Sequence, residues 1–236
     1  MHTSSLKTLL GLEHPPVAVT FVQTLPADIP RVSKQEPSGC SYWKLAAAGQ
    51  VFYATAEDHL GCPIGAYVQG LSLPEEAGQQ LTHVLGMMYS LDYLKPEEVA
   101  QVPRLGRSWV AVIYAPLEQA PLPPDVVIVL GRARPLMLLA EAVRLAGLPL
   151  LPLSGRPACG MIPAVEQSRG VVTNLGCIGN RVYTQIGDDE FYLALPGGCL
   201  TQVEQALPRI CQANRELENY HCGRKELHPL VATVQK

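Results

Sequence analysis

The chain has 236 residues and a formal net charge of -3; 17% of its residues are charged and 47% are hydrophobic. It has no basic run, so it lacks the electrostatic footprint of nucleic-acid binding, and no nucleic-acid partner is expected. The longest apolar stretches, such as Val126–Leu130, are far shorter than the roughly 20 residues that span a bilayer. The N-terminus also lacks the apolar core of a signal peptide. We therefore expect a cytoplasmic protein with no membrane partner.

Apolar runs and helical periodicity predict a regular alternation of elements along the chain. Continuous apolar runs favour strands that are covered on both faces, and proline near the start of a segment favours a helix. In chain order, we expect a strand at 15–22, a helix at 73–90, strands at 108–117 and 124–131, a helix at 134–147, a β-hairpin at 181–196 and a helix at 199–220.

This alternation predicts an α/β or α+β fold, in which a central sheet carries flanking helices. No segment is long or polar enough to act as a linker between independent domains. Residues 1–236 are therefore expected to form a single domain.

Two segments repeat the same order of features. "GCSYWKLAAAGQVFYATAEDHLGC" contains Cys40 and Cys62, and "ACGMIPAVEQSRGVVTNLGC" contains Cys159 and Cys177. Each has a cysteine beside a small residue, a short helical stretch, a glycine, a strand-like stretch and a closing Leu-Gly-Cys. Such repetition predicts two pseudo-symmetric halves, at about 9–95 and 108–217. A two-fold axis between them would bring the four cysteines together.

Four converging thiolates suit a metal or an iron–sulfur cluster. Zinc usually takes close C-x2-4-C pairs, and no C-x-x-C occurs here. Single cysteines on separate loops favour an iron–sulfur cluster, and a nearly closed, symmetric site favours [4Fe–4S]. A zinc or copper(I) thiolate site and simple packing of the cysteines in the core stay open as alternatives. A third alternative is a metal-free thiol enzyme that uses a cysteine pair or Cys199, which stands at a predicted helix start.

For three other residues near the cysteines, two roles each are considered. His59 either donates to a cluster sulfur or replaces a thiolate, or it is a solvated helix cap. Arg156 and Arg181 either stabilise an anionic cluster or substrate, or make surface salt bridges.

The quoted segments also carry a family resemblance. "GCSYWKLAAAGQVFYATAEDHLGCPIGAYVQGL", "RPACGMIP" and "NLGCIGNRVYT" resemble the prokaryotic family called domain of unknown function 169, over about residues 9–217. The resemblance implies that Cys40, Cys62, Cys159 and Cys177 form a set, and it does not name their ligand.

The leading hypothesis is an iron–sulfur protein of redox character, with one cluster held by these four cysteines. Its activity would be electron transfer or reduction of a small substrate, so the sequence leaves open whether the protein is a redox enzyme. The expected partner is a redox protein or a small molecule. A homo-oligomer is also left open.

Overall fold

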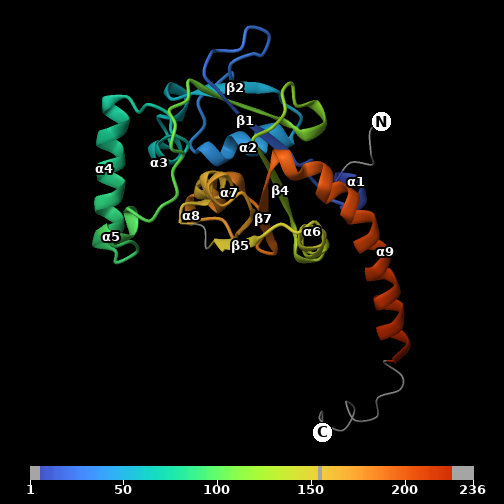
Figure 1. Ribbon diagram of the computed structural model, residues 1–236. Helices are drawn as coiled ribbons and strands as arrows, with labels where there is room; N and C mark the ends of the chain where they lie inside the picture. The colour runs from blue at the N-terminus through green and yellow to red at the C-terminus, as the bar shows by residue number, and fades with distance from the viewer. Residues whose placement is uncertain (1–5, 154–155, 225–236) are drawn as a thin grey trace.

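The computed structural model describes residues 6–153 and 156–224 (Figure 1). It is a mixed α/β structure in which a sheet of seven strands lies between helices. The predicted fold class is therefore confirmed.

The sheet contains strands from nearly the whole chain. Its strands are β1 (Val17–Val22), β2 (Phe52–Thr55), β3 (Ala111–Pro116), β4 (Val126–Arg132), β5 (Leu150–Leu153), β6 (Val171–Asn174) and β7 (Glu190–Pro196). They lie in the order β2-β3-β1-β4-β7-β6-β5. Each neighbouring pair is antiparallel except β5–β6, which is parallel. The predicted strands at 15–22, 108–117 and 124–131 are confirmed.

The central strands are buried on both faces, as their continuous apolar sequence predicts. In β4, Val126 and Ile128 join one hydrophobic core, whereas Val127 and Val129 join a second core on the opposite face. This division follows from the alternation of side chains along a strand.

Helices cover the two faces unequally. The first core contains residues of α2 (Gly39–Ala47), α3 (Pro63–Val68) and α7 (Met161–Ser168), and α8 (Ile178–Thr184) packs against α2 on the same face. The second core contains residues of α1 (Leu6–Leu10), α6 (Ala133–Leu145) and α9 (Leu200–Arg224). The four cysteines of the predicted set all lie in or beside the helices of the first face.

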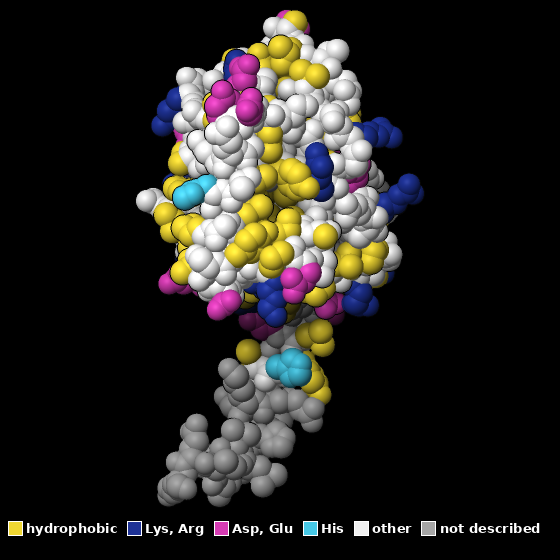
Figure 2. Space-filling model, turned by 90° about the vertical axis from the view of Figure 1, so that its left-hand side faces the viewer, with side chains coloured by type: hydrophobic (Ala, Val, Ile, Leu, Met, Phe, Trp, Pro, Cys, Tyr) yellow, Lys and Arg dark blue, Asp and Glu magenta, His cyan; other side chains and the backbone are white. Residues whose placement is uncertain are grey.

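Two further helices, α4 (Glu75–Ser90) and α5 (Pro96–Val99), stand at the side of the molecule (Figure 1). Ala77 is the buried residue of α4, although the helix carries an apolar stripe. Figure 2 looks onto this side and shows hydrophobic side chains along the middle of the face. Met87 of α4 and Leu91, the residue directly after this helix, are exposed. The part of the chain that the structure describes contains no helix that is long and apolar enough to cross a membrane.

The predicted hairpin at 181–196 is wrong in its first arm. Arg181–Thr184 is the end of α8, and only the second arm is a strand, β7. Cys177 caps the start of this helix, because its Sγ accepts a hydrogen bond from the backbone N–H of Asn180 at 3.4 Å. The helix ends at Gln185, whose φ of 57° is left-handed. This capping by cysteine is not one of the usual sequence signals for a helix start.

The order of the strands is similar on the two sides of the central β1–β4 pair. β1 and β4 pair in the middle, followed by β3 and β2 on one side and by β7 and β6 on the other. However, β3 falls within the predicted second half and pairs with both β1 and β2 of the first half, so the sheet does not divide at the predicted bounds. The halves at 9–95 and 108–217 stay a prediction.

Candidate cysteine site

Each of the four predicted cysteines lies at or near the start of a helix on the first face. Cys40 is the second residue of α2, and Cys62 and Cys177 directly precede α3 and α8. Cys159 lies in a 3-10 turn, Ala158–Gly160, that leads into α7. Helix α2 contacts α3, α8 and the 3-10 turn, so segments more than a hundred residues apart in sequence are brought together.

The site is largely closed to solvent. Cys40 and Cys159 are only 5% and 3% exposed, and both belong to the first hydrophobic core. Cys62 and Cys177 are half-buried, so this is the more open side of the group. Burial raises the pKa of the Cys40, Cys62 and Cys159 thiols, because a thiolate loses its hydration there.

The four thiols lie within electrostatic reach of one another. Burial is the largest cause of the raised pKa of Cys159, and the charges of Cys40, Cys62 and Cys177 raise it further. Cys62 and Cys177 likewise raise the pKa of Cys40. The thiols of Cys40, Cys62 and Cys159 therefore resist ionisation, and a bound cation or cluster would remove that penalty.

Backbone and side-chain donors reach the sulfur atoms. Burial raises the pKa of Cys62, and hydrogen bonds from the backbone of Gly39 and Gly65 oppose that rise. Burial raises the pKa of Cys40, and the nearby side chain of Asn180 opposes that rise. The backbone N–H of the same Asn180 donates to Cys177. Such donors stabilise a sulfur that carries negative charge.

The spacing of the thiols differs from that of a single-ion site. In the described part of the chain, no three ligand atoms from the cysteines lie within 4.8 Å of one another; the group that meets this spacing is Glu13, His14 and Glu190. A zinc ion bound by four sulfurs at about 2.3 Å holds them about 3.8 Å apart. The cysteines as they stand are therefore more widely spaced than the ligands of one zinc ion.

The small residues beside the cysteines have different functions. A Cβ on Gly65 would lie 2.9 Å from the Sγ of Cys62, so this sulfur packs directly on the backbone of α3. A Cβ on Gly61 would lie 2.9 Å from the carbonyl oxygen of Glu36. At Gly176, with a φ of +79°, it would lie 2.7 Å from Oδ1 of Asn180. These glycines thus permit the close packing of the loops.

His59 is not the solvated cap that the sequence offered as one alternative. It is 0% exposed, and Nδ1 bonds the carbonyl oxygen of Thr55 at 2.7 Å, which assigns the proton to Nδ1. Nε2 has no hydrogen-bond partner among the described residues. Burial lowers the pKa of His59. The ring edge faces Tyr42, with centroids 5.0 Å apart, and a Cβ on Gly39 would contact Cδ2 at 3.4 Å.

The two arginines beside the second pair of cysteines hold the backbone. Arg181 donates to the carbonyl oxygens of Leu175, Gly187 and Glu190, and so ties together the loops on either side of α8. Arg156 donates to the carbonyl oxygen of Tyr93 and lies over its ring, with Glu98 3.7 Å away. Neither guanidinium is a free anion-binding group.

Asn180 is the site residue that the sequence analysis missed. It is buried, and its Nδ2 also donates to the hydroxyl of Tyr192 at 3.1 Å. The available signal was an amide three residues after Cys177, where a helix start would turn it back toward the cysteine. That signal was hidden because this segment was assigned to a hairpin.

The other cysteines lie outside this group. Cys211 packs against the second core, as its position on an apolar helical stripe predicts, and Cys222 is exposed. Cys199 is half-buried and lines a cavity beside the end of α7.

Comparisons with known proteins agree with the resemblance. The family model DUF169, described as "Uncharacterised ArCR", matches residues 5–206. The chain is 26% identical over 226 residues to a protein of Methanocaldococcus jannaschii named "Uncharacterized protein MJ0308", covering 89% of this chain and 94% of that protein. No solved structure matches the chain.

Proposed function

We propose that this chain, which belongs to the DUF169 family, is an iron–sulfur protein whose cluster is held by Cys40, Cys62, Cys159 and Cys177. The cluster would take up one electron and pass it on, either to a partner protein or to a small substrate. This function rests on the cysteine group and not on the family, whose description names no activity.

One observation carries the proposal: α2, which contains Cys40, contacts α3, α8 and the 3-10 turn of Cys159, so four cysteines from distant parts of the chain lie at neighbouring helix starts in a mostly dry site. Buried cysteines often serve as small hydrophobic residues. Here four cysteines lie in or beside α2 and the three segments that contact it, and each is at or near a helix start. A shared ligand explains this arrangement better than hydrophobic packing does.

The spacing of the thiols favours a cluster over a single zinc or copper ion. A cluster spreads its cysteine ligands over several iron atoms, so its sulfur ligands stand farther apart than those of one ion. The donors from Gly39, Gly65 and Asn180 also suit it, because hydrogen bonds to the ligand sulfurs tune the potential of a cluster. We favour [4Fe–4S], which needs four cysteines and no further ligand.

The proposal also covers where the protein works and from which side an electron would reach the cluster. All seven cysteines are free, which agrees with a cytoplasmic location. The half-buried pair, Cys62 and Cys177, marks the side on which a redox partner or substrate would come nearest to the cluster.

The test is purification without oxygen, followed by metal and sulfide analysis. We expect a brown protein with equal amounts of iron and acid-labile sulfide, and a paramagnetic signal after one-electron reduction. Stoichiometric zinc or copper without sulfide would replace the proposal with a thiolate metal site. A chain that stays colourless and metal-free after anaerobic reconstitution with iron and sulfide would refute any cluster.

A further inference from the structure

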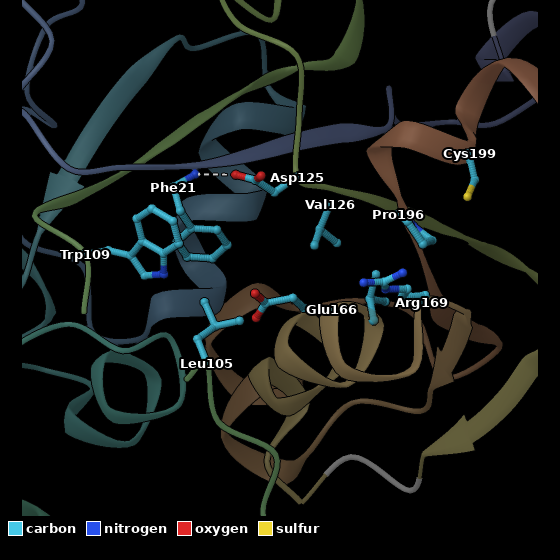
Figure 3. A pocket seen from close by; sticks show the side chains of 10 residues that line it. Phe21, Leu105, Trp109, Asp125, Val126, Glu166, Arg169, Pro196 and Cys199 are labelled. Atoms are coloured by element: carbon cyan, nitrogen blue, oxygen red, sulfur yellow. Dashed lines mark hydrogen bonds between the residues drawn. The ribbon is translucent and has the colours of Figure 1, made fainter. Parts of the chain in front are cut away.

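A second candidate site lies at the opposite end of α7 from Cys159. It is a cavity of about 300 Å³ between the end of this helix, the start of β4 and the end of β7 (Figure 3). Its volume is at the lower end of the range for small-molecule pockets, about 300–1,000 Å³. Its lining includes Phe21, Trp109, Asp125, Glu166, Arg169 and Cys199.

One wall of the cavity is aromatic. The rings of Phe21 and Trp109 lie 5.6 Å apart between centroids and are tilted by 35°. The indole N–H of Trp109 is buried and has no partner among the described residues. Leu105 and Val126 continue the apolar surface. A flat apolar group fits against this wall, and an aromatic ring is the natural choice.

Charged groups face the cavity from two sides. Figure 3 shows Glu166 and Arg169 at the end of α7, with Asp125 across from them. One carboxylate oxygen of Asp125 accepts the backbone N–H of Phe21 at 2.8 Å, which fixes its direction. No ion pair or side-chain hydrogen bond engages Glu166 or Arg169 within the described ranges. These three charges are available to a ligand.

The backbone at Arg169 adds a second observation. Its φ of +51° lies in the left-handed region, at the position after a helix where glycine is usual. A side chain there costs conformational energy relative to glycine. Strained residues of this kind occur preferentially at functional sites.

We infer that this cavity binds a small aromatic zwitterion, with its ring against Phe21 and Trp109, its ammonium group near Asp125 and Glu166, and its carboxylate on Arg169. Two carboxylates and one guanidinium around an aromatic wall match one positive and one negative charge on a compact ligand. This site is independent of the cysteine site, since no cluster ligand lines it.

The test compares three probes that share a phenyl ring: L-phenylalanine, which is a zwitterion, phenethylamine, which is a cation, and 3-phenylpropionate, which is an anion. The intact protein is titrated with each, and binding is read from tryptophan fluorescence and from protection of Cys199 against alkylation, located by mass spectrometry. We expect L-phenylalanine to bind about threefold or more tightly than either singly charged probe.

A variant of Arg169 distinguishes binding in this cavity from nonspecific binding elsewhere on the protein. R169G removes the guanidinium and relieves the left-handed backbone, so it should fold at least as well as the wild type. It should bind L-phenylalanine no better than phenethylamine. R144Q on α6, on the other face of the sheet, is the matched control and should bind like the wild type. Failure of all three probes to protect Cys199, or the same preference in R169G, would overturn the inference.

Discussion

Asn180 acts on both Cys40 and Cys177: its side chain opposes the rise that burial causes in the pKa of the first thiol, and its backbone N–H donates to the Sγ of the second, 3.4 Å away. The two cysteines are far apart in sequence: Cys40 lies in α2, and Cys177 directly precedes α8. A single buried amide therefore couples the two halves of the candidate site. The packing and chemistry of this site lead to four predictions.

The first prediction concerns the four cysteines. Alanine at Cys40, Cys62, Cys159 or Cys177 should remove most of the iron and sulfide from anaerobically purified protein, because in the proposed site each supplies one ligand. The cost in stability of the metal-free chain should be small, about 1 kcal/mol for the buried ones. The prediction is checked by measuring the iron and acid-labile sulfide content of each variant.

The matched control for this set is C222A, which removes an exposed thiol from α9. It should retain the full metal content. Equal metal loss in C222A, or full retention in all four site variants, would contradict the assignment.

The second prediction concerns Asn180. N180A should make the reduction potential of the proposed cluster more negative, because polar donors near the ligand sulfurs stabilise the reduced state. It also leaves the Tyr192 hydroxyl without its donor and should cost about 1–3 kcal/mol of stability. Potentiometry and denaturant unfolding measure the two effects. Y192F is the control, because it removes the hydroxyl but leaves the amide beside Cys40; a shift of equal size in both variants would rule out the direct contact.

The third prediction uses Gly65. G65A would place a Cβ 2.9 Å from the Sγ of Cys62 and should push this sulfur out of position, with lower cluster occupancy. G78A, within α4, would place a Cβ that meets no atom within 4 Å and should stabilise the protein by about 0.5–1 kcal/mol. The iron content of the two variants is compared at equal protein concentration. If G65A holds as much iron as G78A, the tight packing of Cys62 is not needed for binding.

The fourth prediction concerns pH. Burial lowers the pKa of His59 below its usual 6.5, so below that pH the unfolded chain binds a proton that the folded chain does not. The free energy of unfolding of the metal-free protein should therefore fall as the pH drops from 6.5 toward the folded pKa, by up to about 1.4 kcal/mol per unit. It should show no such loss from His59 above pH 6.5.

The matched variant is H59N, whose amide can still donate to the carbonyl oxygen of Thr55. Its unfolding free energy should vary less with pH between 6.5 and 5 than that of the wild type. Exposed His83 on α4 is the comparison site. A pH slope that disappears in H83N and persists in H59N would show that His59 is not the group responsible.

Much of the fold could be predicted because its signals are local. The apolar runs of β1, β3 and β4 and the proline-led helices α4 and α6 were located from sequence within a few residues. The first arm of the predicted hairpin was wrong because "RVYT" has β-branched and aromatic residues that favour a strand. Tertiary contacts of Asn180 and Arg181, together with the cap at Cys177, hold it as a helix instead.

The sequence by itself predicted that four cysteines form a set, because two segments place them in a similar order beside small residues. Only the tertiary structure decided what surrounds them: the amide of Asn180, the buried ring of His59, and a separate cavity whose walls include Trp109 and Arg169. The physical reason is that a short stretch of chain specifies its own backbone geometry. Burial, electrostatic contact and cavities arise from residues that become neighbours only when the sheet and helices pack.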